Sequence, residues 1–123
     1  MGGIIRVEKV KSINILPRHE EAVIPIRKFT EYALNYEADS NKATAFESAL
    51  GYTKDNADSL IANIRQKLPN FTATPKGDRG YGETYEVIME LTGVNGKTAK
   101  VLTAWIDDRN TGQMRLVSAY VDN

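Results

Sequence analysis

The dipeptide Asn95-Gly96 constrains the fold of this chain more than any other feature. It lies between two runs that alternate apolar and polar residues, and a two-residue type I′ turn needs positive φ at both central positions, which Asn and Gly tolerate best. The pattern predicts a β-hairpin whose register is set by the turn. The predicted pairs are Val94 with Lys97, Leu91 with Lys100, Met89 with Leu102, Val87 with Ala104 and Tyr85 with Ile106.

Side chains alternate between the two faces of a strand, so this register assigns a face to every residue of the hairpin. The apolar face holds Tyr85, Val87, Met89, Leu91, Leu102, Ala104 and Ile106, and the mixed face holds Thr84, Glu86, Ile88, Glu90, Val101, Thr103 and Trp105. The only tryptophan would therefore lie among polar neighbours. Such a placement usually marks a contact surface, although a helix or the N-terminal arm that covers this face would make Trp105 part of a second core.

A third strong strand is expected from Met114 to Val121, after the turn that follows Ile106. Its two faces are similar in polarity. We favour Val117, Ala119 and Val121 as the inward residues, which places Ser118 and Tyr120 on the face of Thr103 and Trp105. The turn before this strand is longer than two residues, so the turn does not fix the register.

The first two thirds of the chain favour helices. Pro25 suits the first position of a helix over Ile26–Asn35, with Ile26, Phe29, Ala33 and Tyr32 on one face. Asp39 or Ser40 can cap a second helix over Asn41–Leu50, which would end at Gly51. Thr53 or Asp55 can cap a third helix, which would contain Leu60, Ile61, Ile64 and Leu68 and would end before Pro69.

These elements predict a single α+β domain over residues 1–123, in which two or three N-terminal helices pack on a twisted antiparallel sheet of about four strands. Residues 1–15 are expected to form an arm or an edge strand, residues 16–70 the helical part and residues 71–123 the sheet. Within the sheet part, Phe71–Thr74 is expected as a short first strand and Pro75–Gly82 as a flexible loop with three glycines.

Composition limits the function. The 16 Lys and Arg residues balance the 16 Asp and Glu residues, so any contact with nucleic acid must be local. No apolar run approaches the roughly 20 residues of a membrane span, and no membrane partner is expected. The chain has no cysteine and a single histidine, His19, and it carries no phosphate-binding loop or metal-ligand cluster. We therefore expect no metal ion and no cofactor.

Polar residues of the sheet could cleave a phosphodiester without a metal ion. That reaction needs proton transfer at a ribose 2′-OH, positive charge for the phosphorane and a surface that fixes a base. The candidate catalytic residues are Arg115, Tyr120, Thr103, Ser118 and Glu86, and the candidate substrate-binding residues are Trp105, Tyr81, Arg79, Lys76, Lys42 and Lys28. Each also has an ordinary structural explanation, because Lys and Arg are usually solvated and Thr and Ser on a sheet often only pair across strands.

Several short segments together resemble a small bacterial domain of unknown function. These segments include Leu16-Pro17, Ala22–Pro25, Lys28–Asn35, Lys42-Ala43, Ala49–Tyr52, Tyr81-Gly82, Asn95-Gly96, Thr103, Trp105 and Leu116–Tyr120. That family occurs at the C-termini of polymorphic toxins, including contact-dependent inhibition and Rhs-type proteins, and in phage-related or free-standing proteins. The predicted helices followed by a sheet also resemble the barnase, EndoU, colicin and RelE group of ribonuclease folds.

The resemblance implies a metal-independent ribonuclease toxin that acts on RNA, with tRNA as the expected substrate. It further implies a cognate immunity protein as partner, with a host translation factor as another. Such a domain would be secreted as part of a larger toxin and delivered to the cytoplasm of a target cell, or would be cytoplasmic if free-standing. A non-catalytic protein-interaction module of a toxin or phage-related system remains the alternative.

Overall fold

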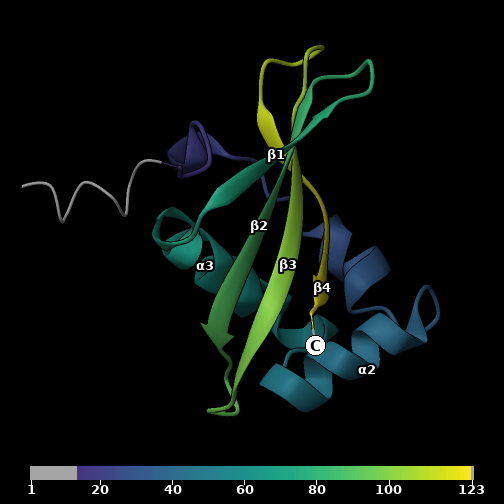
Figure 1. Cartoon of the computed structure of the whole chain (residues 1–123). Helices are drawn as coiled ribbons and strands as arrows, with labels where there is room; N and C mark the ends of the chain where they lie inside the picture. The colour runs from purple at the N-terminus through teal and green to yellow at the C-terminus, as the bar shows by residue number, and fades with distance from the viewer. Residues whose placement is uncertain (1–13, 123) are drawn as a thin grey trace, which may run out of the picture.

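Four antiparallel strands in the order β1-β2-β3-β4 form the frame of the molecule (Figure 1). The computed structural model describes residues 14–122. The strands are β1 (Ala73–Asp78), β2 (Glu83–Thr92), β3 (Thr98–Asp107) and β4 (Met114–Val121). The helices precede the sheet in the chain and cover one of its faces, so the predicted α+β class with N-terminal helices and about four strands is confirmed.

Three helical segments cover that face, and three short 3-10 turns connect them to the rest of the chain. The helical segments are the π-helical η3 (Lys28–Ala33), α2 (Ser40–Leu50) and α3 (Ala57–Lys67), and the turns are η2 (His19–Glu21), η4 (Lys54–Asn56) and η5 (Leu68–Asn70). None of the helices within residues 14–122 has the length and apolarity needed to cross a bilayer.

α2 ends at Leu50 as predicted and begins at Ser40, one residue earlier than predicted. Asp39 accepts a hydrogen bond from the backbone N–H of Lys42 at 3.0 Å, and Gly51 ends the helix with φ of 81°. A polar N-cap and a left-handed glycine satisfy backbone groups that a helix end leaves unpaired. Thr53 caps η4, which leads directly into α3.

The first predicted helix differs from its prediction. Leu34 donates its N–H to the carbonyl of Phe29 at 2.8 Å, five residues back, which defines a π-helical turn. Phe29 and Ala33 are buried as predicted, but Ile26 is 49% exposed and Tyr32 is 54% exposed. The prediction was wrong for these two residues because it assumed the period of an α-helix.

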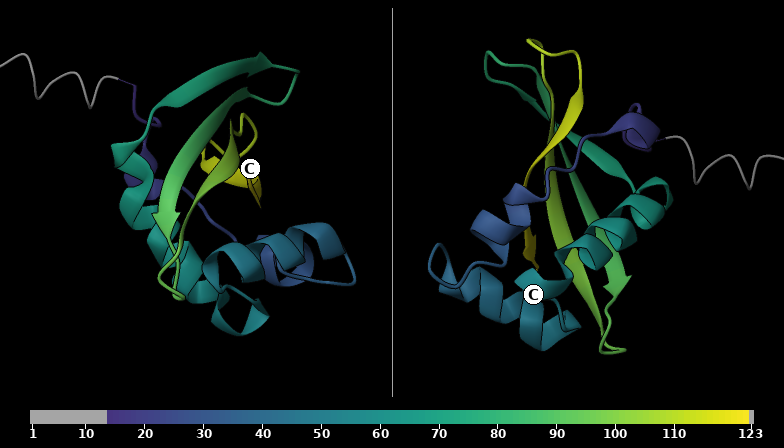
Figure 2. Two further views of the ribbon diagram at one scale, coloured as in Figure 1. Left: turned by 60° about the horizontal axis from the view of Figure 1, so that its bottom comes forward. Right: turned by 180° about the vertical axis from the view of Figure 1, so that it is seen from behind.

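The core lies between the helices and the covered face of the sheet. Side chains with no exposed surface come from every layer, among them Phe29, Phe46, Leu60, Val87 and Trp105. The opposite face of the sheet is concave, because the sheet curls and β1 arches toward β4 (Figure 2). We call this surface the open face.

The predicted register of the hairpin between β2 and β3 is wrong by one residue. Gly93 and Lys97 form the last pair, and the loop Val94-Asn95-Gly96 has three residues, with φ of 85° at Gly96. Gly93 lies against the end of α2, where an added Cβ would come within 2.0 Å of the Leu50 carbonyl oxygen. Only glycine fits there, so this tertiary contact fixes the register and the Asn-Gly dipeptide does not.

A shift of one residue moves every side chain of one strand to the opposite face. Tyr85 pairs with Trp105, and Glu86 pairs with Ala104. Consequently Val101, Thr103 and Trp105 lie on the covered face, whereas Leu102, Ala104 and Ile106 lie on the open face with Glu86 and Ile88.

A β-bulge changes the assignment of β4. Ala104 pairs with Ser118 and Trp105 pairs with Leu116, so Val117 is the extra residue. Met114 and Leu116 point into the core before the bulge, and Ala119 and Val121 do so after it. The prediction is correct for Ala119 and Val121 but wrong for Val117, which is 43% exposed. Ser118 and Tyr120 lie on the face opposite Thr103 and Trp105.

The first strand is longer and later than expected. β1 begins at Ala73 rather than Phe71, and it includes Pro75–Asp78, which had been assigned to the loop. A register irregularity between Pro75 and Gly77 accommodates the proline. The predicted arm or edge strand over residues 1–15 lies almost entirely outside the described residues.

Candidate functional site

Trp105 and Thr103 are core residues and do not form an exposed surface. Both are fully buried, and the Trp105 indole Nε1 donates a hydrogen bond to Thr103 Oγ1 at 2.8 Å. The Thr103 hydroxyl in turn donates to the carbonyl of Val87 at 2.8 Å. The predicted roles of Trp105 as a stacking surface and of Thr103 as a catalytic hydrogen-bonding group are therefore wrong.

Five other predicted site residues come together beside β4. Three adjoining hollows of about 210, 170 and 330 Å³ lie between β4, η3 and the start of α2. Lys28 and Tyr32 line two of them, and Lys42 lines two. We call this surface the β4-edge groove; its lining residues are Pro25, Arg27, Lys28, Tyr32, Ala33, Asn41, Lys42, Ala45, Arg115, Val117, Ser118, Ala119, Tyr120 and Val121.

The lining of the β4-edge groove is cationic. It contains Arg27, Lys28, Lys42 and Arg115 but no carboxylate. Arg27 pairs with Glu31 at 3.3 Å, whereas the other three form no ion pair with any acid of residues 14–122. Charge is balanced over the whole chain, so this surface concentrates positive charge locally.

Two partly exposed aromatic rings accompany these cations. The Lys28 Nζ lies 5.8 Å from the centre of the Tyr32 ring, and the Lys42 Nζ lies 5.7 Å from the centre of the Tyr120 ring. Tyr32 is 54% exposed and Tyr120 is 36% exposed. Paired cations and rings suit a ligand that carries phosphates and flat bases, because the ring can stack on the base while the ammonium group contacts the phosphate.

Pairing along the edge of β4 positions the groove. Val23 forms an isolated parallel bridge with Arg115, in which Val23 N–H donates to the Met114 carbonyl at 2.7 Å and Leu116 N–H donates to the Val23 carbonyl at 2.9 Å. Pro25 has no N–H and cannot continue this pairing, and η3 begins soon after it. The later half of β4 pairs with β3 on one edge, and it contacts η3 and α2 rather than a further strand.

Three further predicted residues line a separate hollow on the open face. This concave-face hollow has a volume of about 270 Å³ and is lined by Lys76, Arg79, Thr84, Tyr85, Glu86, Ala104, Trp105 and Val117. Glu86, Ala104 and Ser118 form one row across three strands, so Glu86 lies roughly 10 Å from the groove residue Ser118. Burial raises the pKa of the Tyr85 hydroxyl, and the nearby Glu83 and Asp107 carboxylates raise it further.

Tyr81 lies apart from both surfaces. It is 70% exposed in the loop between β1 and β2, and it lines neither the β4-edge groove nor the concave-face hollow. Its carbonyl accepts a hydrogen bond from the N–H of Arg109 at 3.0 Å, which ties this loop to the one between β3 and β4. The structure does not bring Tyr81 together with the other predicted binding residues.

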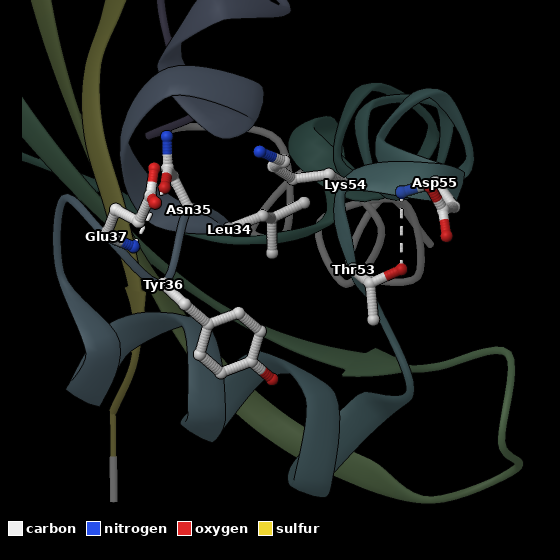
Figure 3. A pocket seen from close by; sticks show the side chains of 7 residues that line it. All are labelled: Leu34, Asn35, Tyr36, Glu37, Thr53, Lys54 and Asp55. Carbon is white, nitrogen blue, oxygen red and sulfur yellow. Dashed lines mark hydrogen bonds between the residues drawn. The ribbon is translucent and has the colours of Figure 1, made fainter.

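A further hollow, of about 350 Å³, lies on the helical side and is a weaker candidate. Figure 3 shows its lining residues, Leu34, Asn35, Tyr36, Glu37, Thr53, Lys54 and Asp55. Several of their polar groups already stabilise local structure: Asn35 accepts from the N–H of Glu37, and Thr53 accepts from the N–H of Asp55. Two carboxylates and one lysine also make this hollow unsuitable for a phosphate.

The Tyr36 hydroxyl beside this hollow donates a hydrogen bond to the Glu47 carboxylate, and this bond raises the pKa of Tyr36. Among residues 14–122, no group of three or more His, Asp or Glu side chains is placed to hold a metal ion.

The groove also contains residues that the sequence analysis does not name as site residues, among them Arg27, Tyr32, Asn41 and Val117. Tyr32 was assigned to the buried face of a regular helix, and Val117 was assigned inward because a bulge was not anticipated. A signal for Arg27 was present in the sequence, because it directly precedes the predicted binding residue Lys28.

Comparison with protein families gives one match over most of the chain. The family model described as Domain of unknown function (DUF6883) matches residues 15–123. Comparisons with curated proteins and with solved structures find no match.

Proposed function

The chain belongs to the DUF6883 family, whose function is unknown, and we propose that it is a toxin domain that cleaves RNA, with tRNA as the expected substrate. The β4-edge groove is the proposed site. The observation that carries the proposal is the lining of this groove, which places four cations beside two partly exposed tyrosine rings without a single carboxylate. The toxin context comes from the resemblance of the sequence, and it entails a cognate immunity protein and delivery to the cytoplasm of a target cell.

The proposed reaction is an internal transesterification that needs no metal ion. The ribose 2′ oxygen attacks phosphorus and its proton passes to water, while the bond from phosphorus to the 5′ oxygen breaks. Tyr120 donates a proton to the departing oxygen and then regains one from water, and the Lys42 ammonium group beside its ring neutralises the charge on the phosphorane. Arg115 and Ser118 contribute further hydrogen bonds, and the products are a 2′,3′-cyclic phosphate and a 5′ hydroxyl.

The test is incubation of the purified protein with total tRNA, with and without cell extract. We expect fragments that end in a cyclic phosphate, and we expect Lys42→Ala or Tyr120→Phe to slow their formation by about a hundredfold. Lys54→Ala is the matched control, because Lys54 lines the hollow of Figure 3 and not the groove. Intact tRNA in both incubations, together with normal growth of cells that express the protein, would exclude this activity.

A second candidate is a non-catalytic module that binds a protein through the same groove. It is favoured by the absence of both carboxylate and imidazole from the groove lining, which leaves no ordinary general base there. In that case tRNA stays intact, Tyr32→Ala abolishes capture of the partner, and Tyr120→Phe leaves capture unchanged. The two candidates therefore differ in their response to loss of one hydroxyl group.

A further inference from the structure

The β4-edge groove and the concave-face hollow share a wall. Val117, the extra residue of the bulge in β4, lines both of them. The hollow also contains Lys76 from β1, although β1 and β4 are the opposite edges of the sheet. The curl of the sheet thus brings both edges around one depression on the open face (Figure 2).

From this arrangement we infer that the concave-face hollow is a second nucleotide subsite, so that the ligand is a single-stranded RNA segment that crosses β4 at Val117 and occupies both surfaces. The inference rests on the proposed function, since it extends the RNA site of the groove. A base can enter a hollow of about 270 Å³ only when it is unpaired, because a duplex turns its bases inward and presents phosphates and sugars.

The cations of the hollow are available to a phosphate. Lys76 and Arg79 form no ion pair with an acid of the described part of the chain. Asp78, the last residue of β1, already accepts hydrogen bonds from the Arg109 guanidinium and from the N–H groups of Gly80 and Gly82. Positive charge therefore remains at the rim that faces β4 across the hollow.

The floor of the hollow suits a nucleoside. Ala104 lies between Glu86 and Ser118 in the row across the three strands. Its side chain is only a methyl group, which leaves depth in the middle of the sheet. The Glu86 carboxylate is half-buried there and can accept hydrogen bonds from a ribose hydroxyl or from an amino group of a base. Thr84 donates its hydroxyl to the Gly77 carbonyl at 2.7 Å, so it supports the wall rather than the ligand.

The test is a length series of 2′-O-methyl oligouridines with one, two, four and eight nucleotides, which cannot be cleaved, together with a blunt duplex of the same chemistry. We expect the affinity of the parent protein to rise at least tenfold between one and four nucleotides. The double variant Lys76→Ala/Arg79→Ala should lose this gain with length but keep its affinity for the mononucleotide within twofold. The dependence of log K on log salt should also become less steep by about 1.4, because each of the two lost phosphate contacts removes about 0.7.

Matched variants separate this inference from the proposed function. Lys28→Ala/Lys42→Ala should weaken binding at every length. Lys54→Ala/Lys67→Ala removes the same charge outside both surfaces, and it should change neither the mononucleotide affinity nor the gain with length. If Lys76→Ala/Arg79→Ala retains the gain with length, or if the duplex binds as well as the single strand, the second subsite is refuted while the groove proposal stands. If the parent binds no RNA of any length, both proposals fail. Arg79→Ala alone, in an exposed loop, provides a second variant whose folding is not at risk.

Discussion

The two faces of the hairpin between β2 and β3 have opposite roles, although they are built from neighbouring residues of the same strands. On the covered face, Val87, Thr103 and Trp105 are fully buried and linked by two hydrogen bonds. On the open face, Glu86 and Ala104 line a hollow that solvent reaches. A polar residue such as Thr103 can be buried on the covered face because its hydroxyl group forms hydrogen bonds there. Polarity alone therefore does not identify a functional site.

The loop decides which residues lie on which face. A two-residue loop would have placed Trp105 beside Glu86, and the observed three-residue loop places it beside Tyr85. The predictions that follow test this assignment, from the largest expected effect to the smallest.

Trp105→Ala should be the most destabilising of these changes. Truncation of a fully buried tryptophan removes a large apolar surface, leaves a cavity and costs about 3–5 kcal/mol of unfolding free energy. Tyr120→Ala, an aromatic truncation on the opposite face at a site 36% exposed, should cost much less. Urea denaturation measures both, and equal midpoints for the two variants would contradict the assignment of the faces.

Gly93→Ala should come next. The added methyl group would meet the Leu50 carbonyl oxygen at 2.0 Å, and such overpacking typically costs about 1–3 kcal/mol. Gly96→Ala is the matched control in the same loop: nothing lies within 4 Å of its Cβ, but its φ of 85° leaves a backbone penalty of about 1 kcal/mol. A larger loss of thermal stability for Gly96→Ala than for Gly93→Ala would show that the turn, and not the contact with α2, sets the register.

This contact explains how far the sequence could predict the fold. The caps Asp39 and Gly51 act within a few residues, so the boundaries of α2 follow from local rules. The register of the hairpin depends on where Gly93 meets Leu50, more than 40 residues earlier in the chain, and no local pattern contains that information. The Asn-Gly dipeptide favours a two-residue turn by local rules, but tertiary packing of Gly93 produces a three-residue loop instead.

Some residues of the candidate groove were predicted from the sequence, but their arrangement was not. Lys28, Lys42, Arg115, Ser118 and Tyr120 were expected to converge, and they do line one groove. They were expected to surround Trp105, which instead lies on the other side of the sheet. The register of the hairpin accounts for this difference, because it moves Trp105 to the covered face. The bulge at Val117 is a separate obstacle: it reverses the alternation midway along β4, and a strict period of two cannot describe both halves of the strand.

Thr103→Val tests the same distinction with a smaller change. The substitution keeps the shape of the side chain but leaves the Trp105 indole N–H without an acceptor, and a buried unpaired group costs about 1–3 kcal/mol. Ser118→Ala, also a loss of one hydroxyl but on the open side, should change stability by less than about 0.5 kcal/mol. If the two variants unfold at the same denaturant concentration, the hydrogen-bonded pair in the core contributes nothing to stability.

Asp78→Asn should give the smallest effect, and its pH dependence identifies its cause. Hydrogen bonds from the N–H groups of Gly80 and Gly82, the first being the larger influence, lower the pKa of this carboxyl below its ordinary value of 3.8, and the Arg109 guanidinium adds to the shift. A lowered pKa means that the folded state favours the ionised form. The stabilising contribution is therefore fully present above the ordinary pKa and is lost as the pH falls through the lowered one.

The carboxyl is exposed, so its link between the two loops should be weak and sensitive to salt. The melting temperature of Asp78→Asn should lie slightly below that of the parent at pH 7, and the difference should disappear as the pH falls below the ordinary value of 3.8. Glu90→Gln, an exposed carboxylate of β2 without an ion pair among residues 14–122, should show no such change. A difference for Asp78→Asn that persists at low pH would mean that the amide disturbs the loop itself, since the carboxylate would then already be protonated in the parent.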